Sequence, residues 1–541
     1  MVLQMYQLTL IPICLYVLYH LYRYHKLSVR RKDFPPGPTP LPIIGNLHQI
    51  PISRPELRFA TYAKEYGPIT GLQLGSHNMI VLNTWEAVHD LIEQKGGSYS
   101  SRPKLAVTDV IVPGGLNPAF NKHGELWRKQ RKLMVEFLGG DRTDAMKPVQ
   151  DAESTQMIYD IMFAAENFED HVLRSFGSVI LETVYGQREN TFKPGGKLAR
   201  FFEVEEEWAA AVGATASPPI QSFPFLESVP DWATPWKGWR RRAAKVKKAQ
   251  KGLYLGLLRE TKERLAVGKG VDSFMARCLK IQDKEWYDDL YLAYCGGILM
   301  EGGIETSAST TMVFILAMAA FPDTMKRAQF EVDTTCGLKR LPGKDDIPNL
   351  PYVRACMLEV LRWRPIIPLA VPHTTSAEDT YKGYTIPTNT DVIINAWNIH
   401  QDGLFFQDPA TFNPARYLEN ERGGLPRTPA ASEYKGRKSV YSFGAGRRVC
   451  PGQRFAENAL IISFAKLAWA FDIEPTGPLA IDTWDDWTDG LVTRPKNLNV
   501  RFKLRDHGRR KVIEEAWGEL TCSCVNMKME WSNMAPISLV L

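Results

Sequence analysis

The chain has 541 residues, a hydrophobic fraction of 44% and a net charge of +6. This length allows one large core with many helices, and the modest charge argues against a nucleic-acid-binding protein, which usually presents a concentrated basic face. Eight cysteines without a CxxC pair are too few for a disulfide scaffold, and the absence of any Asn-x-Ser/Thr site is typical of a chain that stays outside the secretory lumen.

An apolar segment over residues 8–22 begins the chain. Basic residues follow it directly: Arg23, Lys26, Arg30, Arg31 and Lys32. Positive charge after an apolar segment keeps that side in the cytosol, so residues 1–32 are predicted to be a membrane anchor with a cytosolic body behind it. Pro12 and His20 weaken the segment as a spanning helix. A cleaved signal peptide is the alternative, but it requires a basic start and a small-residue cleavage site that this sequence lacks.

A proline-rich stretch over residues 33–50 follows the anchor. Consecutive prolines fix φ and remove backbone donors, which predicts a stiff extended connector; a plain linker is the alternative. No other clear break occurs over residues 51–520, which are predicted to form the catalytic domain. Residues 521–541 show no clear period and receive no role, and a mispredicted gene end is one hypothesis for them.

Helical periodicity dominates the body. The sequence around a Gly-Ser-His-Asn turn in residues 69–83 predicts strands, and residues 380–397 are also β-rich. The clearest helices are predicted over residues 151–185, 240–266, 287–320 and 350–363. Residues 217–236 mix prolines with aromatics, which indicates a mobile lid or a membrane-touching loop, with an ordinary surface connection as the alternative. The fold class is therefore mostly α with a minor β portion.

Residues 302–306, GGIET, lie inside the long apolar helix predicted over 287–320. The mid-helix hydroxyl of Thr306 can bond to an upstream carbonyl and bend the helix, and the two glycines remove bulk beside it. Glu305 adds an acid next to this hydroxyl. Close packing of small residues against a neighbouring helix is the alternative explanation.

A single cysteine lies in the glycine-rich basic loop FGAGRRVCPG, residues 443–452. Nearby positive charge and backbone N–H groups favour a thiolate, which can ligate a metal. One cysteine cannot hold zinc or an iron–sulfur cluster alone, whereas haem needs only one strong protein ligand on its proximal side. A structural cysteine in a tight turn remains the alternative.

This loop resembles FxxGxRxCxG, the haem-binding signature of the cytochrome P-450 superfamily, and the chain is most similar to fungal microsomal members. The residues in register are Phe443, Gly446, Arg448, Cys450 and Gly452. The resemblance implies a cytochrome P-450 fold and a haem b cofactor (iron protoporphyrin IX) whose iron has Cys450 as its axial ligand. It also implies that Phe443, Gly446 and Arg448 surround the cofactor.

Other marks of the superfamily occur in the expected order. Glu359 and Arg362 resemble the ExxR pair, which places both side chains on one helix face, and Arg416 would complete a structural charge network. An exposed pair of no consequence is the alternative for ExxR alone. Trp127 and Arg131 resemble the pair that holds a haem propionate.

His373 aligns with another propionate partner, as Arg448 does. Residues 302–306 resemble the oxygen-binding motif, which assigns Thr306 and Glu305 to proton delivery. The basic residues beside Trp127 form either a solvated face or a docking surface for an acidic reductase. The resemblance therefore implies NADPH electrons from NADPH–cytochrome P-450 reductase, and a single-pass protein of the endoplasmic reticulum membrane with a cytosolic catalytic domain.

The resemblance also indicates where a substrate would lie. Pocket residues are expected from five segments: 105–120, 200–236, the start of GGIET, IIPLAVP after ExxR, and 487–492. Their apolar character predicts a hydrophobic or aromatic substrate, in secondary-metabolite biosynthesis or aromatic-acid hydroxylation. The alternatives are a reductase-independent haem-thiolate isomerase or dehydratase, which tends to lose the threonine, a non-catalytic haem protein, or a cysteine without haem.

Overall fold

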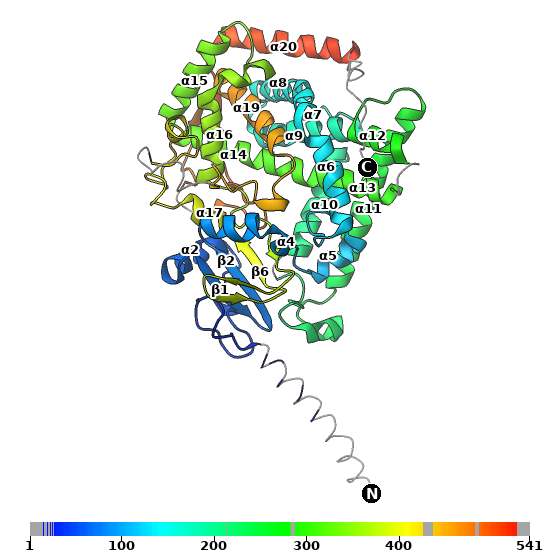
Figure 1. The fold of residues 1–541 in the computed structure, drawn as a ribbon. Coiled ribbons are helices and arrows are strands. Elements are labelled where there is room, and N and C mark those ends of the chain that lie inside the picture. Colours follow the sequence, from blue (N-terminus) through cyan, green and yellow to red (C-terminus); the bar gives the residue numbers. More distant parts are fainter. Residues whose placement is uncertain are drawn as a thin grey trace.

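A computed structural model describes residues 15, 19, 22, 24, 26, 28–213, 215–282, 287–425, 436–481 and 486–526. Helices fill most of the body, and the largest sheet lies at one corner of it (Figure 1). The helices are α2 (Pro55–Tyr66), α3 (Trp85–Val88), α4 (Gly96–Tyr99), α5 (Ala106–Ile111), α6 (Glu125–Leu138), α7 (Gly140–Ala145), α8 (Lys147–Phe163), α9 (Phe168–Tyr185), α10 (Lys197–Val212), α11 (Trp239–Ala266), α12 (Phe274–Ile281), α13 (Asp289–Gly303), α14 (Glu305–Ala320), α15 (Pro322–Cys336), α16 (Pro351–Trp363), α17 (Ala396–His400), α18 (Arg416–Glu419), α19 (Gln453–Ala470) and α20 (His507–Asn526). The strands are β1 (Ile69–Leu74), β2 (His77–Leu82), β3 (His373–Thr374), β4 (Asp379–Tyr381), β5 (Tyr384–Ile386), β6 (Asp391–Ile394), β7 (Phe471–Pro475) and β8 (Val500–Leu504).

The largest sheet has the strand order β1-β2-β6-β3 and confirms that both segments predicted to contain strands do so. β1 and β2 form an antiparallel hairpin with Ile69 opposite Leu82, and β6 joins β2 in parallel with Val392 opposite Ile80. All residues of β1 and β6 are buried, because this sheet is covered on both faces. β3, at the edge, carries His373. The predicted class, mostly α with a minor β portion, is confirmed.

Two of the predicted helices match the structure within one residue. These are 240–266, which is α11, and 350–363, which is α16. The helix predicted over 287–320 is interrupted at Ile304, whose φ of −87° and ψ of −70° lie at the edge of the right-handed helical region, and it is therefore described as α13 and α14. This break falls inside GGIET, and it follows two glycines that disfavour a regular helix.

The helix predicted over 151–185 is wrong in its continuity. Ala164, with φ of −142°, ends α8, and a short 3-10 turn leads into α9. The two helices pack against each other, and Arg174 of α9 forms a buried ion pair with Glu153 of α8. Hydrophobic periodicity continues through the reversal because both helices face the same core, so the pattern alone does not reveal the turn.

The centre of the body is built around α14. The ring of Phe314 on α14 stacks on Phe464 of α19 with centroids 3.8 Å apart. Within the described residues, Asp289–Ala320 is the one helical stretch long and apolar enough to cross a membrane, and 78% of its most apolar window is buried inside the protein. The apolar side chains of this stretch therefore pack in the hydrophobic core of the protein.

The predicted anchor over residues 8–22 lies outside the described residues, apart from Leu15, Tyr19 and Tyr22. The proline-rich stretch contains no α-helix among its described residues and lies directly on β1. The Gly71 N–H donates to the Pro36 carbonyl at 2.7 Å, and a Cβ on Gly37 would lie 2.0 Å from the Gly71 oxygen. The connector is thus held against the sheet.

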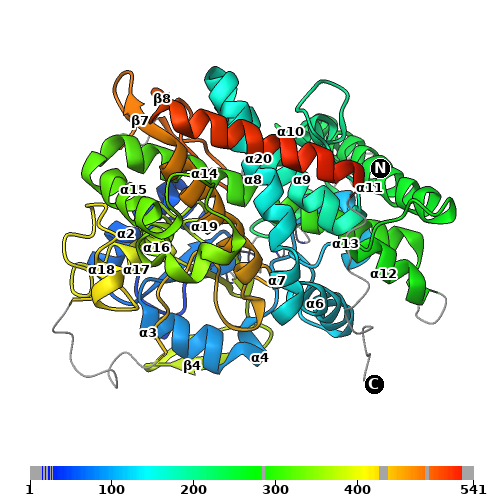
Figure 2. The same ribbon diagram turned by 90° about the horizontal axis from the view of Figure 1, so that it is seen from above.

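The last helix, α20, crosses the surface of the body above α8 (Figure 2). Trp517 of α20 packs on Tyr159 of α8 with ring centroids 5.4 Å apart. The helix continues to Asn526, so the boundary predicted at residue 521 falls inside a helix. Residues 527–541 lie outside the described part of the chain.

Candidate active site

An internal cavity of about 330 Å³ joins the sequence motifs. Cys450 and Thr306 both line it, although 144 residues separate them in the sequence. Its walls come from α6, α9, α13, α14, α19, the segment after α16 and the cysteine loop. Much of the remaining wall is apolar and includes Ile180, Leu299, Leu361, Ile366, Phe443 and Leu460. The cavity is thus largely apolar, and its described wall includes one cysteine, Cys450, together with three threonines, Thr183, Thr306 and Thr310.

The cysteine loop has a shape that requires glycine at one position in particular. Gly446 has a φ of +61°, and a Cβ there would lie 2.3 Å from the carbonyl oxygen of Ile92. A side chain would be both strained and in collision with the backbone. The Cys450 N–H donates to the carbonyl of Phe443 at 2.9 Å, which closes the loop. Cys450 is thereby held on the cavity wall just before α19.

The thiol of Cys450 is exposed to the cavity, yet it lies inside the body. Burial raises the pKa of this thiol, while the Gly452 N–H and the guanidinium of Arg131 lower it. These two groups and the N-terminus of α19 favour the thiolate once a metal cation also stabilises it. No group of three or more His, Cys, Asp or Glu side chains that could hold a metal ion occurs among the described residues. The cysteine therefore suits a metal whose other ligands come from a cofactor.

Three arginines line the same cavity: Arg102, Arg131 and Arg448. The guanidinium of Arg448 donates to the carbonyls of Ser100 and Asn121 at 2.8 and 2.7 Å. Burial, and then the charges of Arg102 and Arg131, lower the pKa of Arg448 to about 8. None of the three forms an ion pair within the described chain. A buried cationic cluster of this kind is stabilised by an anionic partner, and the two propionates of haem fit it.

Arg102 is a site residue that the sequence did not reveal. It lies in an irregular segment before α5 and donates to the carbonyls of Val371 and Pro372 at 2.6 and 2.7 Å. Burial lowers its pKa to about 9. No periodicity marks this position, so only its convergence with Arg448 in space identifies it.

Trp127 and Arg131 both line the cavity from α6, as their spacing of one helical turn predicts. The guanidinium carbon of Arg448 lies 4.1 Å from the centroid of the Trp127 ring. Arg131 donates to the carbonyl of Val449, beside Cys450. Trp127 and Arg131 therefore both contact residues of the cysteine loop, Arg448 and Val449.

His373 is buried on the cavity wall, and its Nδ1 lies 2.7 Å from the carbonyl oxygen of Tyr99. Because a carbonyl only accepts, Nδ1 carries the proton. Burial, and then the charge of Arg102, lower the pKa of His373 well below its usual value. The neutral ring therefore has no proton on Nε2. Nε2 can donate to a haem propionate only when the negative charge of the propionate favours the doubly protonated imidazolium.

Thr306 lies on the wall formed by the break between α13 and α14. Its hydroxyl donates to the carbonyl of Gly302 at 2.8 Å. Ile304 itself keeps helical hydrogen bonds on both sides: its N–H donates to Met300 O, and its carbonyl accepts from the Ala308 N–H, each at 3.1 Å. The expected bending of the helix by this threonine is therefore present.

Glu305 adjoins Thr306 but is not among the described residues that line the cavity. Burial raises the pKa of its carboxyl, and the positive charge of Arg494 partly opposes this. Glu305 thus holds a proton more readily than an exposed glutamate, from a position beside the cavity.

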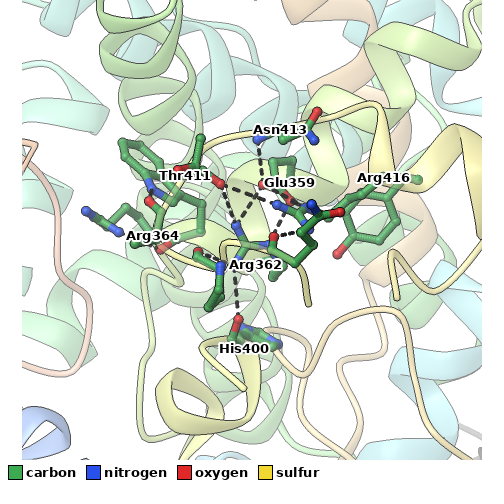
Figure 3. Close-up of polar contacts among 12 residues, drawn as sticks. Glu359, Arg362, Arg364, His400, Thr411, Asn413 and Arg416 are labelled. Atoms are coloured by element: carbon green, nitrogen blue, oxygen red, sulfur yellow. Dashed lines mark hydrogen bonds and ion pairs between the residues drawn. The ribbon is translucent and has the colours of Figure 1, made fainter. Parts of the chain in front are cut away.

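Glu359, Arg362 and Arg416 meet in one buried network (Figure 3). Arg362 donates to both carboxylate oxygens of Glu359 at 2.7 Å, and Arg416 Nε lies 3.2 Å from Glu359. The Asn413 N–H adds a third donor at 2.8 Å. Both Glu359 and Arg362 are fully buried, which rules out the exposed-pair alternative for this motif.

The network also ties α16 to later segments of the chain. Arg362 donates to the carbonyls of His400 and Pro409 at 3.0 and 2.7 Å. The Ser442 hydroxyl donates to Leu361 O at 2.6 Å, so the same helix also supports the start of the cysteine loop. The Glu359–Arg362 pair and the cysteine loop therefore stabilise the same region of the structure.

The expected substrate segments contribute unequally to the cavity. Residues 105–120 supply Pro118 and Ala119, and the segment after ExxR supplies Ile366, Ile367, Ala370 and Val371. Described residues of 200–236 and 487–492 supply none. Trp487 is instead buried against other parts of the core and donates to Ala480 O at 3.1 Å.

Comparison with known proteins agrees with this geometry. The profile of the family described as Cytochrome P450 matches residues 35–502. The chain is 35% identical over 516 residues to the cytochrome P450 monooxygenase fogE of Aspergillus ruber, covering 94% of each chain. It is 32% identical over 519 residues to virE of Hypocrea virens, covering 95% of this chain and 93% of that one, and 34% identical over 506 residues to acuD of Aspergillus aculeatus, covering 93% and 94%. Both are also described as cytochrome P450 monooxygenases.

Proposed function

The chain belongs to the cytochrome P450 family and is a haem-thiolate monooxygenase, and we propose that it oxidises an apolar or aromatic small molecule with NADPH electrons from a partner reductase. The cavity that Cys450 and Thr306 share, with its largely apolar walls, is the observation that carries this proposal. Such a cavity excludes water and takes up a small apolar molecule.

The residues present fit a haem. Cys450 would ligate its iron, and Arg102, Arg131 and Arg448 would neutralise its propionates, with Trp127 packed under Arg448. When bound, haem supplies the dioxygen-activating iron, and a thiolate ligand favours cleavage of the O–O bond. The chain itself positions the substrate, excludes water and delivers protons.

Thr306 is assigned to holding the proton-bearing water. Its own proton is committed to Gly302 O, so its oxygen remains free to accept a hydrogen bond from a water in the cavity. Glu305 is assigned to supplying the proton, because burial raises its pKa and it adjoins Thr306. Proton delivery then starts beside the cavity and ends at the threonine on its wall.

We place the substrate in fungal secondary metabolism or aromatic-acid hydroxylation. The matched relatives come from fungi, and the walls are rich in aliphatic side chains such as Ile366, Ile367 and Leu299. An isomerase or dehydratase would not need a threonine at this wall, and Thr306 therefore favours oxygen insertion.

Membrane and reductase contacts form a second part of the proposal. The segment over 217–236 lies beside Tyr24, whose ring contacts Phe223 and Phe225, and Trp232 is 77% exposed. These exposed aromatics support attachment of residues 1–32 and this segment to the endoplasmic reticulum membrane, with residues 51–520 in the cytosol. Exposed Arg128 and Arg447 near the cysteine loop support docking of an acidic reductase.

Oxygen labelling tests the proposed function. Microsomes containing the full chain and its reductase receive NADPH, heavy-isotope dioxygen and a metabolite extract of the source organism. Mass spectrometry should find a product that is one labelled oxygen heavier, and only when NADPH is present. A changed product without label would overturn oxygen insertion and favour the isomerase alternative. Microsomes carrying the Cys450→Ala chain serve as the control.

A further inference from the structure

Two buried carboxyl groups that the proposed mechanism does not use lie beside the cavity. Glu301 lies on α13, and Glu205 lies on α10 close enough that the charge of Glu301 raises the pKa of Glu205. The Tyr254 hydroxyl donates to Glu301 Oε1 at 2.7 Å, and the Asn117 amide donates to Oε2 at 3.0 Å. Neither glutamate forms an ion pair with a described lysine, arginine or histidine. Two acids thus lie together without a cation.

Acceptors in this cluster remain open. Glu205 Oε1 is buried and has no hydrogen-bond partner. Gln250 on α11 is 0% exposed, and its amide reaches Glu301 with Nε2 3.5 Å from Oε1, while its own Oε1 has no partner. Buried acceptors are almost always satisfied in native proteins, so these two oxygens are available to accept a hydrogen bond from a ligand or a water.

The electrostatics favour the same kind of ligand. Burial raises the pKa of Glu301 to about 7. Burial, and then the charges of Glu301 and Glu305, raise the pKa of Glu205 to about 9. The pair therefore keeps protons that isolated glutamates would lose, and a cationic group that binds here would take the place of a proton and let a carboxyl ionise.

The cluster lies next to residues that line two cavities. Glu301 is followed by Gly302 on the wall of the main cavity. Asn117, which donates to Glu301, lines a second cavity of about 250 Å³, whereas the next residue, Pro118, lines the main one. Trp208, less than one turn after Glu205 on α10, also lines the second cavity. The two carboxyls therefore lie directly behind lining residues of both cavities, although neither glutamate is itself a lining residue.

We propose that Glu301 and Glu205 bind a hydrogen-bond-donating group, a hydroxyl or a cationic nitrogen, at one end of an otherwise apolar substrate. The carboxyls hold that end beside Asn117 and Gly302 while the apolar remainder lies in the main cavity. They then determine which carbon approaches the cysteine side. This inference rests on the proposed function, because it requires that the main cavity takes up an apolar molecule.

Binding of three matched compounds to the haem-loaded full chain tests the inference. The compounds are butylbenzene, phenylbutanol with a terminal hydroxyl, and phenylbutylguanidine, and calorimetry gives each dissociation constant. The wild type should bind at least one of the two donor compounds about tenfold more tightly than butylbenzene. Tighter binding of phenylbutylguanidine than of phenylbutanol would show that the carboxyls select a cationic nitrogen. Equal binding of these two compounds would show that a hydroxyl donor is enough.

The substitutions Glu301→Gln and Glu205→Gln keep the side-chain volume and should each reduce this preference severalfold, with butylbenzene binding unchanged. Glu203→Gln, an exposed position on α10, is the matched control and should keep the preference. The carbon monoxide difference spectrum verifies haem loading in every variant. If butylbenzene binds but no variant changes the preference, the inference is overturned and the proposed function stands. If butylbenzene does not bind at all, the apolar-substrate proposal fails first, and this inference with it.

Discussion

The hydroxyl of Thr306 donates to the carbonyl oxygen of Gly302 at 2.8 Å, across the break between α13 and α14. This bond orients the threonine oxygen on the wall of the cavity that Cys450 also lines. The break, the bond and the cavity depend on one another, because a regular helix would satisfy the same carbonyl with a backbone N–H.

Removing this hydroxyl should separate electron use from product formation. Thr306→Ala is expected to lower product formed per NADPH about tenfold and to raise hydrogen peroxide, because the water that delivers protons loses its partner. Thr306→Ser keeps the hydroxyl and should retain most of the coupling. Product, peroxide and NADPH are measured together. Unchanged coupling in Thr306→Ala would contradict the assigned role.

The identity of the iron ligand can be read from an absorption spectrum. Cys450→Ala is expected to abolish the thiolate-type spectrum of the reduced carbon monoxide complex, because no other described cysteine lines the cavity. Cys356→Ala, at a fully buried position on α16, should keep the spectrum with some loss of stability. A thiolate-type spectrum in Cys450→Ala would refute the ligand assignment.

The Glu359 network should dominate stability near the cofactor. Glu359→Gln leaves the charge of buried Arg362 without its carboxylate, which is expected to lower the free energy of unfolding by about 3–5 kcal/mol. Glu474→Gln breaks an ion pair with Arg501, which is 68% exposed, and should change it by less than about 1 kcal/mol. Urea unfolding of both haem-loaded variants gives the comparison. Equal losses would show that burial does not matter at this site.

Alanine substitutions at two glycines with positive φ distinguish the cost of backbone strain from the cost of a steric collision. Gly446→Ala combines a φ of +61° with a Cβ 2.3 Å from Ile92 O, so haem incorporation should fall sharply. Gly383→Ala has a φ of +83° but nothing within 4 Å of the new Cβ, and it should lose only about 1 kcal/mol of stability. Haem content per chain and unfolding temperature are the measurements. Normal haem content in Gly446→Ala would contradict the close approach.

The buried carboxyl of Glu301 predicts a pH dependence of stability. Its pKa is about 7 in the folded chain and about 4.3 when unfolded. Between these values the folded chain holds a proton that the unfolded chain has lost, so stability is full below about pH 4 and falls as pH rises through about 7. Between pH 5 and pH 8, the free energy of unfolding of the wild type should fall by about 3 kcal/mol more than that of Glu301→Gln, as measured by urea unfolding. If the free energy of unfolding changed with pH equally in the wild type and in Glu301→Gln, the raised pKa of Glu301 would be contradicted.

Much of the architecture followed from local sequence. Helical periodicity identified α11 and α16 within one residue, and the i, i+3 spacing of Glu359 and Arg362 placed both on one helix face. The lone cysteine among glycines identified the cofactor loop. These features depend on residues close together in the chain, where spacing and backbone preference determine geometry directly.

Only the tertiary structure decided which distant residues meet. Arg102 and Arg448 are 346 residues apart, and nothing local to either predicts that they converge on one cavity. The same is true of Glu205 and Glu301. The reversal after α8 lets α8 and α9 pack against each other, with Arg174 of α9 paired with Glu153 of α8. Packing of that kind is a property of the whole chain, and hydrophobic periodicity records only that a face is buried, without naming its partner.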